Sequence, residues 1–142
     1  MSSVYEKILL AVDHSEMSDR AVTAARDLAL LSKGEVWVLH LREREMGAKT
    51  GVLTTDETTE DANAKVAACV EALAQAGVKA HGEVRSTIFG YAAREVVNDA
   101  KEIGADIIVM GSRGRSDIAG LLLGSTAHKV IHLSDRPVLV VR

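Results

Sequence analysis

The residues best suited to chemistry lie in one stretch, MGSRGRSDIAGLLLGST, from Met110 to Thr126. It follows the apolar run ADIIVM, which is typical of a strand buried on both faces. Its chemistry would be anion binding, because glycine lets successive backbone N–H groups turn toward a phosphate and arginine adds positive charge. The residues concerned are Gly111, Arg113, Gly114, Arg115, Gly120, Gly124, Ser125 and Thr126.

The same glycines have a plainer interpretation. Glycine is common in turns after strands, and Ser125 could serve only as the cap of the helix that follows. Two well-known phosphate motifs are absent from the sequence, namely Gly-x-x-x-x-Gly-Lys-Ser/Thr and a Gly-x-Gly-x-x-Gly after the first strand. The stretch therefore indicates two phosphate-type contact points, around Gly111 and around Gly124, but neither a P-loop nor an ordinary dinucleotide site.

The composition predicts one globular domain spanning residues 1–142, with 47% hydrophobic and 26% charged residues. The formal net charge of −3 argues against a general nucleic-acid binder, which usually carries a basic face. We expect no membrane association, because no apolar run is long enough to span a bilayer and the start MSSVYEK lacks a signal-peptide core. The single cysteine, Cys69, cannot form an internal disulfide, so a cytoplasmic location is predicted.

Five strand-like runs alternate with four helical patterns along the chain. The predicted strands cover residues 7–13, 35–41, 79–85, 105–111 and 137–142, and the predicted helices cover 15–32, 62–77, 88–104 and 125–134. This alternation predicts an α/β fold, a single-domain open sandwich with a five-stranded parallel sheet and helices on both faces. Ligands of such sheets bind beyond the carboxyl ends of the strands, where Gly111 lies.

One segment, from Arg42 to Thr58, fits neither pattern and is predicted to be a long loop. Loops of this length inside a compact domain are usually functional. Because it leaves the second strand near the predicted ligand edge, we interpret it as a candidate lid.

The spacing Gly111-x2-Gly114-x9-Gly124-Ser125 resembles the nucleotide-binding signature of universal stress proteins, Gly-x2-Gly-x9-Gly-Ser/Thr. The likeness extends through ILLAVDHSEMSDRAVTAARDLA, VWVLHL, ADIIVMGSRG and LLGSTAHKVIHLSDRPVLVV. It implies a Rossmann-like fold similar to that of adenine nucleotide alpha hydrolases. It also implies the ATP-binding subgroup, because every glycine of the signature and Ser125 are present.

The resemblance assigns roles to individual residues. Asp13, which ends the first strand, would lie near the ribose and phosphates and hold the Mg²⁺ that arrives with ATP; its alternative role is to cap the next helix. The backbone of Leu41 would meet the adenine edge, and His40 beside it is interpreted as a packed strand residue. The full nucleotide-binding set is Ala11, Val12, Asp13, Leu41, Met110, Gly111, Arg113, Gly114, Gly124, Ser125 and Thr126.

We expect a nucleotide-responsive module of a stress response rather than an efficient enzyme. Phosphoryl transfer needs an oriented nucleophile, and the sequence offers no clear residue to orient water, so no catalytic residue is assigned. Slow Mg²⁺-dependent ATP hydrolysis and a structural homodimer without turnover are the alternatives. The homodimer would form through the last strand, Val138 to Arg142, if that hydrophobic strand lies at a sheet edge.

Overall fold

The computed structural model describes residues 4–13, 16–46, 53–54, 58–112 and 123–142. Strands and helices alternate along these residues as the sequence predicts. The strands are β1 (Lys7–Val12), β2 (Glu35–Met46), β3 (Leu53–Thr54), β4 (Ala80–Ile88), β5 (Ile107–Gly111) and β6 (Val138–Val141), and the helices are α1 (Glu16–Ser32), α2 (Thr59–Gln75), α3 (Ala92–Ile103) and α4 (Ser125–Leu133).

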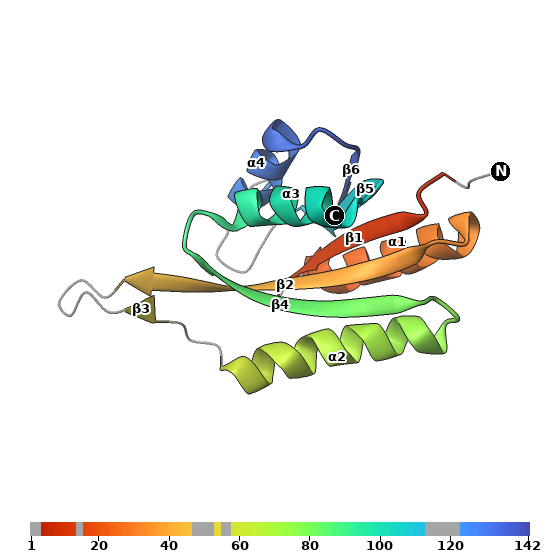
Figure 1. The fold of residues 1–142 in the computed structure, drawn as a ribbon, viewed down its shortest axis with the longest axis horizontal. Coiled ribbons are helices and arrows are strands. Elements are labelled where there is room, and N and C mark those ends of the chain that lie inside the picture. Colours follow the sequence, from red (N-terminus) through yellow and green to blue (C-terminus); the bar gives the residue numbers. More distant parts are fainter. Residues whose placement is uncertain (1–3, 14–15, 47–52, 55–57, 113–122) are drawn as a thin grey trace.

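Five strands form the parallel sheet, in which β1 is central (Figure 1). It pairs with β2 on one side and with β5 on the other, while β4 extends the sheet beyond β2 and β6 extends it beyond β5. The two-residue strand β3 pairs antiparallel with the end of β2. The predicted α/β architecture with a five-stranded parallel sheet is confirmed, and β3 is an addition to it.

The helices cover both faces of the sheet, as predicted (Figure 1). On one face, α1 and α2 pack on side chains such as Leu10, Val38 and Val109. On the other face, α3 and α4 pack on Leu9, Leu39 and Ile108 in a second core cluster. Neighbouring strand residues thus serve opposite cores, which explains why the strands read as continuous apolar runs. None of the helices in the described part of the chain could cross a membrane.

The second strand is longer than predicted. We expected it to end at Leu41, but β2 continues to Met46, so the first part of the predicted loop from Arg42 to Thr58 is strand. Its pairing with β4 runs from Val36 to Arg44, and β3 pairs with its last two residues. Residues 47–52 and 55–57 of the predicted lid lie outside the described residues.

The third predicted helix began too early. Ile88 is the last residue of β4, and α3 starts at Ala92. Gly90 between them has a φ of 95°, a left-handed conformation that glycine adopts easily and that a helix cannot contain. Ile88 therefore ends the strand, and the residues Phe89, Gly90 and Tyr91 connect it to α3 rather than forming the first turn of the helix.

Candidate functional site

The candidate site is the edge of the sheet where β1 and β5 end, beside residues 40 and 41 of β2, which continues to Met46. The chain leaves β1 toward β2 on one side and reaches β5 on the other, so the direction of winding reverses around β1. At such a reversal the connections diverge and leave a crevice beyond the carboxyl ends of the strands. The register brings Ala11 beside Met110 and Val12 beside His40, although these residues are distant in sequence.

Asp13 is fixed at the end of β1 by a two-way contact with α1. Its backbone N–H donates to the hydroxyl of Ser18, and that hydroxyl donates to Oδ1 of Asp13 at 2.8 Å. Ser18 is buried and Asp13 is half-buried. The contact holds the carboxylate at the sheet edge through a side chain of the first helical turn. Sequence reasoning missed Ser18, because only the fold brings its hydroxyl back to the strand end.

His40 links β2 to the end of β1. Its side chain is only 2% exposed, and Nδ1 lies 2.9 Å from the carbonyl oxygen of Val12. A carbonyl oxygen only accepts, so Nδ1 carries the proton and donates. This agrees with the interpretation of His40 as a packed strand residue. Leu41 follows it, half-buried against the α3–α4 core cluster, one residue beyond the pair of Val12 and His40.

The first half of the glycine stretch continues directly from β5. Met110 is buried, and Gly111 pairs with Val141 of β6. The N–H of Ser112 then donates to the carbonyl of Val141 at 2.7 Å, which holds the chain against β6 for one residue beyond the strand. Ser112 is buried and was not among the predicted site residues, although it stands between two that were.

The second half of the stretch returns to the same point. The N–H of Gly124 donates to the carbonyl of Ser112 at 2.5 Å, which brings the two predicted phosphate contact points together. Arg113 and Gly114 lie outside the described residues, as do the residues that follow them to 122. Among the described residues, the hydrogen bond between Ser112 and Gly124 therefore joins the two ends of this segment.

Among the described residues, no side chain caps the first backbone N–H groups of α4. Its N-cap residue is Gly124. The alternative in which Ser125 is the cap is therefore wrong: Ser125 is the first helical residue and is exposed, and Thr126 is half-buried. Uncapped N–H groups and the positive end of the helix dipole favour a phosphate or carboxylate at this position.

The described residues contain no group of three or more His, Cys, Asp or Glu side chains arranged to hold a metal ion. Asp13 is the one predicted metal contact, and its carboxylate oxygens are the ligand type that Mg²⁺ prefers.

Comparison with known proteins shows the family to which this chain is similar. The model of the universal stress protein family matches residues 4–142. Universal stress protein YxiE of Bacillus subtilis is 36% identical, covering 98% of this chain and 100% of its own. The solved structure of MJ0577, from Methanocaldococcus jannaschii, is similar with a TM-score of 0.80 at 29% identity, over 97% of this chain and 96% of that one. A universal stress protein solved in complex with cAMP has a TM-score of 0.71 at 26% identity, covering 99% of each chain.

Proposed function

Because this chain belongs to the universal stress protein family, we propose that it binds an adenine nucleotide, ATP with Mg²⁺, at the edge formed by β1, β2, β5 and the start of α4. The observation that carries the proposal is the hydrogen bond from Gly124 to Ser112. It joins both halves of the glycine signature beside the uncapped start of α4, where a phosphate chain would meet backbone N–H groups. The similar protein solved with cAMP supports an adenine nucleotide as the ligand.

Each part of the nucleotide has residues of matching chemistry. The adenine would meet the backbone of Leu41 beside Ala11 and Val12, which offer apolar surface. The ribose and Mg²⁺ would face Asp13, whose position Ser18 fixes. The remaining members of the set border the sugar or contact the phosphates: Met110, Gly111, Arg113, Gly114, Gly124, Ser125 and Thr126.

The proposed activity is nucleotide binding that a partner senses in a stress response, rather than rapid hydrolysis. The charged and polar groups described at this edge position a ligand. The proposed set includes no clear residue to deprotonate or orient an attacking water, which phosphoryl transfer requires. ATP would connect three strands to a helix start, so its presence would stiffen this face.

The edge strand supports a second proposal, a homodimer through β6. Among the described strands β6 pairs only with β5, and Leu139 on it is 39% exposed. Pairing of two copies along Val138 to Arg142 would cover this hydrophobic edge. Sedimentation of the native chain and of Leu139→Glu tests the idea, since the substitution should convert a dimer to a monomer. A monomeric native chain contradicts it.

Thermal unfolding with and without ATP–Mg²⁺ tests the nucleotide proposal. Ligand at about 100 times its Kd stabilises a fold by roughly 2.7 kcal/mol, which shifts Tm by several degrees in a domain of this size. GTP at the same concentration should give a smaller shift. A missing shift could also mean that the protein already holds nucleotide from purification. Extraction of the denatured protein detects such nucleotide and separates this case from an absence of binding.

Asp13→Asn and Asp106→Asn make a matched pair for this assay. In Asp13→Asn the amide keeps an oxygen to accept from Ser18 but lacks the charge that would hold Mg²⁺, so the ATP shift should fall. Asp106 accepts from the N–H of Lys7 at 2.9 Å, at the opposite end of the sheet, and its variant should keep the full shift. Equal shifts in both variants contradict the role of Asp13, and no shift with no extracted nucleotide contradicts the proposed function.

A further inference from the structure

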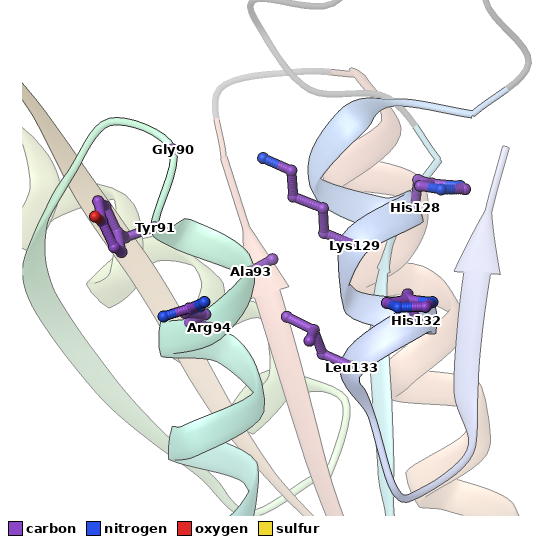
Figure 2. A pocket seen from close by; sticks show the side chains of 8 residues that line it. All are labelled: Gly90, Tyr91, Ala93, Arg94, His128, Lys129, His132 and Leu133. Atoms are coloured by element: carbon purple, nitrogen blue, oxygen red, sulfur yellow. The ribbon is translucent and has the colours of Figure 1, made fainter.

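A second concave surface lies between α3 and α4, apart from the candidate nucleotide site (Figure 2). Its volume is about 660 Å³, within the range of about 300–1,000 Å³ that small-molecule sites occupy. The described residues that line it are Gly90, Tyr91, Ala93, Arg94, His128, Lys129, His132 and Leu133. None of them belongs to the set proposed for the nucleotide.

The middle of this groove is apolar and its sides are polar (Figure 2). Ala93 faces α4 from α3, and Leu133 extends from α4 toward α3, so a ligand between the helices would touch hydrocarbon. Tyr91 flanks the groove on the α3 side with its ring about half exposed. The guanidinium carbon of Arg94 lies 6.0 Å from the centre of that ring, which keeps a cation beside an aromatic surface.

The charge of the groove is of one sign. Arg94 and Lys129 form no ion pair with any residue that the structure describes, and Lys129 extends from α4 toward α3 (Figure 2). No acidic side chain is among the described lining residues, while the chain as a whole has a net charge of −3. Two unneutralised cations within a concave surface create a local positive potential that concentrates anions.

From this combination we propose that the α3–α4 groove binds a small organic anion, one with a carboxylate, sulfonate or phosphate head and an apolar body. The head would lie between Arg94 and Lys129, and the body would cover Ala93, Leu133 and the ring of Tyr91. His128 and His132 also line this surface, on the side of α4 that faces away from α3 in this view (Figure 2). The proposal is independent of nucleotide binding, since the two ligand sites share no residue.

Binding of anilinonaphthalene sulfonate, followed by its fluorescence, tests this proposal on the full chain. The dye has a sulfonate head and an aromatic body, so its emission should rise on binding. Decanoate should displace it, and inorganic phosphate at equal ionic strength should not, because phosphate has no apolar body. Displacement by phosphate as effective as that by decanoate would overturn the proposal, as would the absence of dye binding.

Charge reversal locates the dye. Arg94→Glu with Lys129→Glu should weaken binding on the order of tenfold, because two attractive contacts become repulsive. Lys101→Glu is the control, since Lys101 is an exposed lysine of α3 outside the groove and its variant should bind within about twofold of the native chain. All three sites are exposed, so the variants should keep the fold. Equal affinity in the double variant and the control, or complete displacement of the dye by ATP, overturns the proposal.

Discussion

A buried carboxyl group on α3, that of Asp99, should make the free energy of unfolding decrease as pH rises. Asp99 is 0% exposed, and its nearest cation is Arg85 of β4, whose Nη2 lies 3.0 Å from Asp99 Oδ1. The same guanidinium also serves Glu102, at 2.9 Å, and Glu83. One cation therefore faces three carboxylates, and neither oxygen of Asp99 has a hydrogen bond of good geometry among the described residues.

Burial, followed by repulsion from Glu83, raises the pKa of Asp99 from 3.8 to about 6, against the opposing effect of Arg85. The folded state therefore binds this proton more tightly than the unfolded state does. The difference amounts to about 3 kcal/mol of stability that is present below about pH 4 and is lost as pH rises through 6. The hydrogen bond that Arg85 donates to Glu102 raises the pKa of Arg85, so the guanidinium stays charged throughout.

Asp99→Asn removes this titration and keeps the shape of the side chain. We expect the free energy of unfolding of the native chain to fall by about 2 kcal/mol between about pH 4.5 and 7.5 from this group, and the variant to lack that part of the decrease. Urea unfolding at both pH values measures it, and the histidines contribute equally to both proteins. Asp135→Asn is the control, because the hydrogen bond from Arg136 lowers the pKa of Asp135, which therefore titrates below this range. The same pH dependence in Asp99→Asn and the native chain would refute the reasoning.

Substitutions at two further residues test the packing of the strands and helices that position the candidate site. In Gly82→Ala the new Cβ would lie 2.5 Å from Cγ1 of Val66, so either the Val66 side chain or α2 must shift; we expect a loss of about 1–3 kcal/mol, measured by urea unfolding, and an unchanged midpoint would contradict it. Arg136 donates from Nη1 to the carbonyls of Ala100 at 2.9 Å and Ala105 at 2.7 Å, at the end of α3. Arg136→Met should cost about 2 kcal/mol in the same assay, and Arg136→Lys should recover only part of it, because lysine lacks the planar fork.

The elements whose side chains are buried could be identified from the sequence. The run Ile107–Gly111 is predictable because β5 lies between two helical layers, and its first four residues are buried. The extension of β2 beyond Leu41 is different, since REREM carries charges and no alternation of apolar residues. That segment is strand because its backbone pairs with β4 as far as Arg44 opposite Ile88. Pairing between distant backbones leaves no local signal in composition.

For the candidate site too, the sequence indicates some features, and only the fold reveals the others. Glycine spacing singled out the stretch from Gly111 to Gly124 as a candidate, because the positions of glycines are read directly from the sequence. The contacts that fix the site could not be read from it. The Ser18 hydroxyl on Asp13, the His40 ring on the Val12 carbonyl and the hydrogen bond from Gly124 to Ser112 all depend on the tertiary fold.

The register of the sheet explains how a short sequence motif can be enough to define the candidate site at this edge. Because β1 is central, Ala11 pairs with Leu39 of β2 on one side and with Met110 of β5 on the other. The strands β1 and β5 therefore end at one level, beside His40 and Leu41 of β2, which itself continues to Met46. A slip of one residue in either pairing would turn apolar side chains away from their helices and expose them, which makes such a slip costly. The two core clusters therefore fix the relative positions of the strand ends to within a residue. Hydrophobic packing therefore aligns the polar groups at that edge. The proposed ligand chemistry then needs only the few residues that follow each strand.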